Sequence, residues 1–195
     1  MPMNIGIDFD DVLIRTNEHL AIWHNEHYGP EYAVKDIDTY DLFKIWQCSE
    51  VEMFRRFFEF CEGKEHRRTR TVQGAKAVLA KLRRRGDEMC IITSRPDRVR
   101  VQTEYLVHKH FPSLADRLVF TAVAVDGLLV KKPKAEVCRE RGVEIMIEDN
   151  LDYACNVAGA GIRVLLLNRP WNQSEELSRN IQRVYSWKEI FHELT

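Results

Sequence analysis

Carboxylate, hydroxyl and amide side chains follow three apolar runs of the sequence, at the points where buried strands would end. These residues are Asp8 and Asp10 after the first run, Thr93 and Ser94 after the second, and Glu148, Asp149 and Asn150 after the third. In an open parallel sheet such positions share one edge, where ligands bind. Carboxylate oxygens suit Mg²⁺, and a hydroxyl can hold phosphoryl oxygens. The pattern therefore predicts a site for a divalent cation and a phosphate.

Basic side chains extend this chemistry. Lys131, Lys132 and Lys134 stand at the start of a predicted helix, and Arg95 directly follows the hydroxyl pair. A phosphate dianion repels the carboxylates at the same edge, so positive charge has to offset both. We expect a lysine of this group to supply part of that charge.

Each feature by itself also has a plain structural explanation. Asp8 and Asp10 could cap a turn, Thr93 could mark an ordinary end of a strand, and Glu148 and Asp149 could cap the following helix. The features occur together, in order, and all at the carboxyl ends of predicted strands. Their combination favours a functional site over three unrelated caps.

The elements that position these residues alternate between strands and helices. Continuous apolar strands separated by amphipathic helices are typical of a parallel sheet that is covered on both faces. We expect strands at 5–9, 88–93, 117–123, 143–149 and 162–167, and helices at 74–86, 97–111, 134–142, 151–161 and 186–194. The predicted fold class is α/β, with a Rossmann-like parallel sheet between helices.

A helical, aromatic-rich segment interrupts this alternation after the first strand. Residues 16–70 show helical spacing and no convincing strand, and Ser49 with Glu52 forms a candidate capping box. We expect a catalytic core of residues 1–15 and 71–195 with a small helical cap of residues 16–70. The basic run at 64–70 is interpreted as a solvated linker, with a contact to a substrate phosphate as the alternative.

The sequence resembles the haloacid dehalogenase superfamily over almost its whole length. The four segments GIDFDDVL, IITSRP, KKPKAEVC and IEDN resemble the four motifs of that superfamily. The segments TYDLFKIW, EVCRERGVEIMIEDN and LLLNRPWN are similar to its 5′(3′)-deoxyribonucleotidase-like branch. Asp11 and Val12 depart from the Gly and Thr that are frequent at these positions, a variation that the family tolerates.

The resemblance implies a role for each matching residue. Asp8 would be the nucleophile that forms an aspartyl-phosphate, and Asp10 would be the general acid and then the base. Mg²⁺ would be bound by Asp8, by the backbone carbonyl of Asp10 and by Asp149. Thr93 would hydrogen-bond a phosphoryl oxygen. The lysine of the third motif would pair with the nucleophile and the phosphate.

The identity of that lysine and the substrate contacts stay open. The spacing to the glycine at 142 favours Lys134, while Lys132 directly precedes a proline as in another common form of the motif. Further candidates for substrate binding are Ser94, Arg95 and Lys132 near the strand ends and the aromatic residues Phe43 and Trp46 in the cap. Aromatic residues at helical spacing also fit a cap core.

Composition limits the class of partner. The 195 residues carry 29 Lys and Arg against 30 Asp and Glu, so the net charge of −1 provides no global field for nucleic acid or an anionic membrane. No apolar stretch approaches the roughly 18 residues that a membrane span needs. Five widely spaced cysteines without a C-x-x-C pair favour reduced thiols in a cytoplasmic protein. A homo-oligomer is possible but not readable from the sequence.

These observations together predict a Mg²⁺-dependent phosphatase that acts on a small phosphomonoester. The resemblance implies a nucleoside or deoxynucleoside monophosphate as substrate. The alternatives are a phosphatase for a non-nucleotide metabolite or a nucleic-acid end, a phosphomutase, and a non-catalytic binding protein of the same fold. The presence of both Asp8 and Asp10 argues against the last of these.

Overall fold

A seven-stranded sheet in the order β4-β3-β2-β1-β5-β6-β7 forms the centre of the computed structural model, which describes residues 1–29, 32–125, 128–174 and 176–195. Six strands are parallel, as predicted for a Rossmann-like α/β fold. The strands are β1 (Asn4–Ile7), β2 (Glu88–Pro96), β3 (Leu118–Val125), β4 (Leu128–Lys131), β5 (Ile145–Glu148), β6 (Arg163–Leu167) and β7 (Ile181–Val184).

Alternate residues of the strands build two separate hydrophobic layers, because successive side chains of a strand point to opposite faces. Ile91 belongs to the layer under α5, α6 and α9, while its neighbour Ile92 belongs to the layer under α7 and α8. Both faces of the sheet are therefore covered, as the continuous apolar runs predict. These helices are α5 (Ala75–Arg85), α6 (Arg100–His110), α7 (Lys134–Glu140), α8 (Leu151–Gly159) and α9 (Trp187–Glu193).

The two edges of the sheet differ from the sequence-based expectation. β4 is antiparallel to β3, with Val123 opposite Val130, so this edge is not parallel. At the other edge β7 pairs in parallel with β6. Both edge strands have only four residues, and β7 carries the polar pair Gln182 and Arg183 at its centre. The polar centre of β7 breaks the apolar run by which the central strands were recognised, whereas β4 (LLVK) is apolar and only short.

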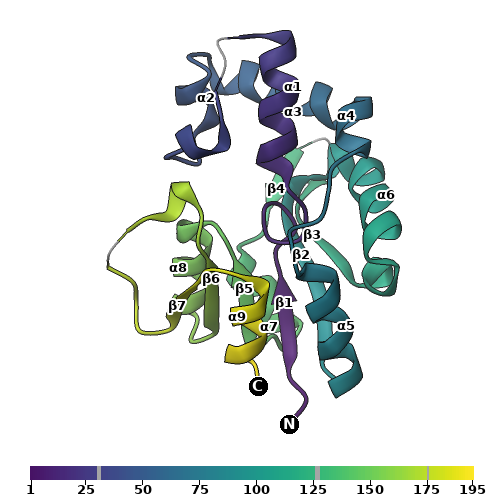
Figure 1. Ribbon diagram of the computed structural model, residues 1–195, viewed down its shortest axis with the longest axis vertical. Helices are drawn as coiled ribbons and strands as arrows, with labels where there is room; N and C mark the ends of the chain where they lie inside the picture. The colour runs from purple at the N-terminus through teal and green to yellow at the C-terminus, as the bar shows by residue number, and fades with distance from the viewer. Residues whose placement is uncertain (30–31, 126–127, 175) are drawn as a thin grey trace.

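Four further helices form a cap between β1 and β2 in the chain, and they lie at the end of the molecule opposite the chain termini (Figure 1). Their aromatic residues build a third hydrophobic cluster. Ser49 caps α3 through an N–H···O bond of 3.2 Å from Glu52, which is one half of the predicted capping box. The helices are α1 (Thr16–His27), α2 (Leu42–Ile45), α3 (Glu50–Glu62) and α4 (Lys64–Arg67).

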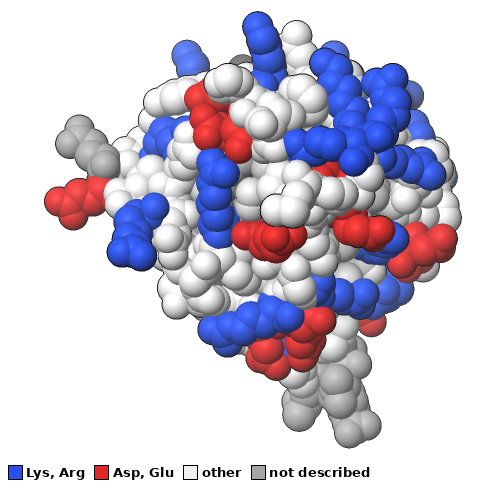
Figure 2. All heavy atoms as spheres, turned by 90° about the horizontal axis from the view of Figure 1, so that it is seen from below, with Lys and Arg blue, Asp and Glu red and all other residues white. Residues whose placement is uncertain are grey.

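The surface matches the balanced composition. On the end that carries the chain termini, acidic and basic side chains are interspersed (Figure 2). All five cysteines are free, and Cys61, Cys90 and Cys138 are buried. None of the helices in the described part of the chain has the length and apolar character that crossing a membrane requires.

Candidate active site

The site lies where β1, β2 and β5 end side by side at the carboxyl edge of the sheet. Asp8 continues the pairing of β1 with β5 through an N–H···O bond of 2.9 Å to Ile147, which fixes its backbone next to Asp149. The chain then turns sharply, with Asp11 in the left-handed region at φ 53°. The sheet thus brings Asp8, Asp10 and Asp149 to one edge, as the sequence predicts.

Lys134 occupies the centre of this group. Its ammonium group contacts Asp8 Oδ1 and lies 2.7 Å from Glu148 Oε2. Glu148 is held in turn by N–H groups of Asp149 and Asn150, each 3.1 Å from Oε1. Glu148 therefore orients the lysine within the site, rather than acting only as the helix cap that the sequence also allowed.

Lys132 lies elsewhere. Its side chain is partly exposed and pairs with Glu136 at 3.3 Å and with Glu140, both on α7. Of the two lysines that the sequence offered for the third motif, only Lys134 contacts the candidate nucleophile. Lys131 lines the site cavity and donates a hydrogen bond of 2.6 Å to the Tyr153 hydroxyl.

The buried acids outnumber their positive partner. Asp8, Glu148 and Asp149 are at most 5% exposed and each places a carboxylate oxygen within 4.8 Å of the others. Burial raises the pKa of Asp8 well above its ordinary value although Lys134 opposes the rise, and burial and the neighbouring Glu148 raise the pKa of Asp149. With Lys134 as the contacting cation, two negative charges stay uncompensated when all three acids are ionised. A divalent cation with oxygen ligands fits this charge and this donor set.

Asp10 has a different environment. Arg95, whose side chain is only 1% exposed, binds its carboxylate with Nη2 2.7 Å and Nε 3.2 Å from Oδ1, and the Thr16 hydroxyl donates to the same oxygen. Burial by itself raises the pKa of Asp10, but the Arg95 guanidinium outweighs this and holds the pKa below its ordinary value. Asp10 is therefore ionised near neutral pH. Arg95, which we expected to contact substrate, is engaged with this aspartate.

His66 of α4 supports the same arginine. It is fully buried, and its Nε2 lies 2.8 Å from Arg95 Nη1. Thr69 is buried as well, whereas the Lys and Arg side chains of the run at 64–70 are exposed, so its charges are solvated as the sequence indicated while two of its residues pack inward. The charged neighbours of His66 in the run hide this burial at the level of the sequence.

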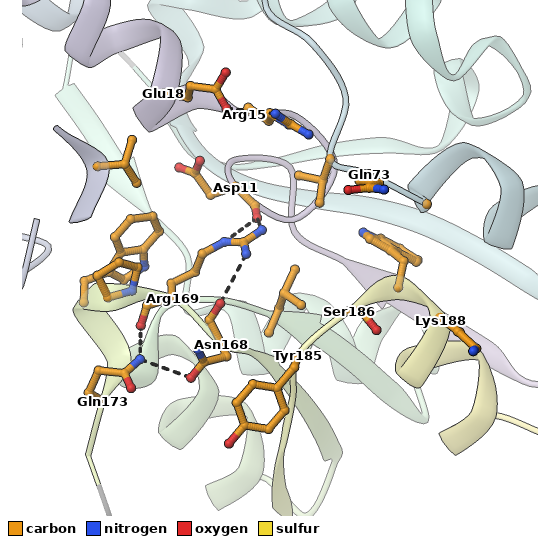
Figure 3. A pocket seen from close by; sticks show the side chains of 17 residues that line it. Asp11, Arg15, Glu18, Gln73, Asn168, Arg169, Gln173, Tyr185, Ser186 and Lys188 are labelled. Atoms are coloured by element: carbon orange, nitrogen blue, oxygen red, sulfur yellow. Dashed lines mark hydrogen bonds and ion pairs between the residues drawn. The ribbon is translucent and has the colours of Figure 1, made fainter.

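The loop after β1 is also held from the opposite side. Arg169, which follows β6, donates from Nε to the Asp11 carbonyl oxygen at 3.0 Å, and Nη2 contacts the same oxygen. Figure 3 shows its guanidinium pointing to Asp11, where both residues line a second cavity of about 910 Å³. Burial and the neighbouring Asp10 raise the pKa of Asp11 to about 7. Sequence reasoning gave no role to Arg169.

The cavity above the acids has a volume of about 330 Å³ and is shared by core and cap. Its floor includes Ser94 and Arg95 at the end of β2, and the cap supplies apolar walls. The apolar and aromatic cap residues that line it are Leu20, Tyr40, Leu42, Met53, Phe54 and Phe57, and the start of α1 adds the polar residues Thr16 and Asn17. A polar floor under an apolar roof suits a ligand with a phosphate at one end and a flat or apolar group at the other.

Several predicted contacts lie outside this cavity. Trp46 is 5% exposed and stacks on His24 at a centroid distance of 4.4 Å, inside the cap cluster. Phe43 does not line the cavity either. Thr93 is fully buried and accepts a hydrogen bond from the Arg95 backbone N–H at 3.2 Å, so Ser94 is the hydroxyl that faces the cavity.

The fold of this chain is shared by solved hydrolases of the haloacid dehalogenase class. A hydrolase of that family from Deinococcus radiodurans, solved with phosphate and sodium, has a TM-score of 0.68 at 18% identity, covering 99% of this chain and 95% of the other. A predicted phosphatase from Clostridium acetobutylicum has a TM-score of 0.71 at 14% identity, covering 100% and 98%.

Sequence comparison defines the family more narrowly. Residues 2–194 match the family described as 5′ nucleotidase, deoxy (pyrimidine), cytosolic type C protein, and the chain belongs to this family. It is also 26% identical over 189 residues to a nucleotidase of Clostridium acetobutylicum, covering 97% of this chain and 92% of the relative. The protein is thus a phosphomonoester hydrolase of the haloacid dehalogenase superfamily.

Proposed function

We propose that the protein hydrolyses a small phosphomonoester through an aspartyl-phosphate on Asp8, with Mg²⁺ held by Asp8, Asp149 and the Asp10 backbone carbonyl. The observation that carries this proposal is the buried contact of Asp8 with Lys134 beneath a cavity of phosphate-ester size. The ion, when bound, supplies the positive charge that the acidic cluster lacks.

The residues divide the reaction into two steps. The Asp8 carboxylate attacks phosphorus, the bond to the ester oxygen breaks, and Asp10 gives its proton to the leaving oxygen. A water molecule then attacks phosphorus with Asp10 as base, which releases phosphate and restores Asp8. Lys134 and Ser94 hold the phosphoryl oxygens in this scheme, and Thr93 is the alternative hydroxyl.

Arg95 favours one protonation state of Asp10. Because the guanidinium lowers the pKa of Asp10, the arrangement described here is the ionised form, which the second step needs. The acid role in the first step requires this contact to loosen when substrate enters the cavity. Arg95 therefore influences protonation of the leaving oxygen indirectly, because it sets the protonation state of Asp10.

A nucleoside or deoxynucleoside monophosphate is the substrate class that we propose. Membership of a nucleotidase family supports it, and so does the apolar roof formed by Met53, Phe54 and Phe57. A planar base can stack on such side chains. The family name and the free cysteines support a cytoplasmic location.

A substrate panel tests the proposal. Phosphate release is measured for 5′- and 3′-(deoxy)nucleotides, sugar phosphates and p-nitrophenyl phosphate, with Mg²⁺ or EDTA, for the wild type and Asp8→Asn. We expect metal-dependent release that is highest for nucleotides and lost in Asp8→Asn. Preference for sugar phosphates would contradict the substrate class, and undiminished release in Asp8→Asn would contradict the mechanism.

A further inference from the structure

The carboxylate of Asp149 receives hydrogen bonds from two parts of the chain. Trp171 Nε1, in the segment after β6, lies 3.0 Å from Asp149 Oδ2. The Tyr40 hydroxyl, from the cap, lies 3.2 Å from the same oxygen and 3.4 Å from Oδ1. Asn172 Nδ2 also donates to the Asp149 backbone oxygen at 2.7 Å. Both the side chain and the backbone of Asp149 are thus held by hydrogen-bond donors.

Tyr40 connects the cap to the Asp149 carboxylate. Its ring packs edge-on against Trp171, with the ring centroids 5.9 Å apart at 89°. Although the residue is 41% exposed, its hydroxyl end reaches the buried carboxylates. Burial and the negative charge of Asp149 raise the pKa of Tyr40 well above its ordinary value, so the hydroxyl keeps its proton and donates it to the carboxylate.

We propose that Tyr40 and Trp171 are positioning residues for Asp149 as a metal ligand, and that Tyr40 thereby couples metal binding to docking of the cap. This inference rests on the proposed metal site. Trp171 engages only Oδ2, and the Tyr40 hydroxyl lies nearer to Oδ2 than to Oδ1, so Oδ1 is the less engaged oxygen and the one we assign as the ligand atom. Groups that orient a ligating carboxylate commonly change metal affinity when they are removed.

Coupling of this kind is reciprocal. If the docked cap orients Asp149 for Mg²⁺, bound Mg²⁺ must favour the docked cap by the same free energy. The docked cap would then cover both the bound metal and the substrate, and it would exclude water before the aspartyl-phosphate forms. Tyr40 lines the substrate cavity as well, so one side chain touches both the cavity and the metal ligand.

Metal affinity measured without substrate tests the positioning role. Mg²⁺ is titrated into wild type, Tyr40→Phe and Trp171→Phe by isothermal calorimetry, with Tyr105→Phe as control. Tyr105 is similarly exposed, at 46%, and lies on α6. We expect Mg²⁺ binding about 10- to 100-fold weaker in Tyr40→Phe and Trp171→Phe, with the melting temperature of metal-free Tyr40→Phe and the affinity of Tyr105→Phe unchanged. Wild-type affinity in Tyr40→Phe would overturn the inference.

Hydrogen exchange of the cap tests the coupling. We expect Mg²⁺ to slow amide exchange at residues 34–46 in the wild type and in Tyr105→Phe, and not in Tyr40→Phe. Exchange that Mg²⁺ leaves unchanged in the wild type would overturn the coupling. A wild type that binds no Mg²⁺ would instead refute the proposed metal site, and the inference with it, so the two failures are distinguishable.

Discussion

Asp8 and Asp10 are paired with different cations, and each pairing has a different consequence for its aspartate. Lys134 lies between Asp8 and Glu148, whereas Arg95 binds Asp10. The first arrangement places a positive charge beside Asp8, the proposed nucleophile. The second holds Asp10, the proposed acid–base residue, in its ionised form.

Replacing Lys134 by Met is expected to lower kcat by about 100- to 1,000-fold, because a preorganised charge next to the reacting group is lost. Lys132→Met is the matched control, since its partners Glu136 and Glu140 lie on the surface of α7. Phosphate release and a circular-dichroism melt are measured for both variants. Activity lost in Lys132→Met and kept in Lys134→Met would show that the lysine assignment is wrong.

Replacing Arg95 by Gln removes the group that lowers the pKa of Asp10. The pKa of Asp10 should rise, so its ionised form should be lost at a higher pH than in the wild type. We expect the acidic limb of the kcat profile with p-nitrophenyl phosphate to move to higher pH. An acidic limb at the same pH in both proteins would mean that Asp10 does not control it.

At the scale of elements, the central strand β1 is packed between two neighbours without room for a larger residue. A Cβ atom on Gly6 would lie 2.8 Å from Met146 Sδ and 3.1 Å from Val143 Cγ1. Glycine is therefore required here for packing rather than for its backbone conformation.

Gly6→Ala is expected to lower the free energy of unfolding by about 1–3 kcal/mol, the usual effect of overpacking a core. Gly159→Ala provides the comparison, because no atom lies within 4 Å of its added Cβ at the end of α8. Urea denaturation of both variants measures the difference. Equal stabilities for Gly6→Ala and the wild type would show that the core relaxes around the methyl group.

The central elements could be predicted because their signals are local. Apolar runs predicted β1, β2, β3, β5 and β6, and the acids at strand ends predicted Asp8, Asp10 and Asp149 as one group. The edge strand β7 was missed because a short, partly polar strand depends on its pairing partner β6 rather than on a local apolar run. The edge strand β4 (LLVK) is apolar and pairs with β3 directly before it, with Val125 opposite Leu128, so a local signal was present in the sequence although the strand was not predicted. The contact of Tyr40 with Asp149 spans 109 residues, and no local pattern encodes such a contact.

At the scale of the whole molecule, cap and core are joined through polar contacts as well as through the chain. His66 of the cap lies 2.8 Å from Arg95 Nη1, which is bound to Asp10 of the core. Trp46 and Phe43, predicted to face the substrate, lie outside the cavity instead. The sequence placed aromatic residues in the cap, but the way the helices pack decides which of them face inward.

Stability should depend on pH through His66. Burial, and then Arg95, lower its pKa to about 3, while an unfolded histidine titrates near about 6.5. Below about pH 6.5 the unfolded state therefore binds a proton that the folded state rejects, and stability falls as the pH drops toward about 3.

Between about pH 6.5 and about pH 5 we expect His66 to contribute a loss of about 1–2 kcal/mol. His66→Gln keeps an acceptor for Arg95 and cannot titrate. Urea unfolding at the two pH values should therefore show a smaller loss in the variant than in the wild type. The same loss in both proteins would show that other groups cause the acid sensitivity.

The central claim is that Asp8 carries the phosphoryl group during turnover. Its most direct test is rapid acid quenching of wild type and Asp8→Asn during turnover of a ³²P-labelled deoxynucleoside monophosphate with Mg²⁺, followed by peptide mapping. We predict label on the peptide that contains Asp8 in the wild type and none on Asp8→Asn. Label on another residue, or phosphate release by Asp8→Asn at the wild-type rate, would contradict the account.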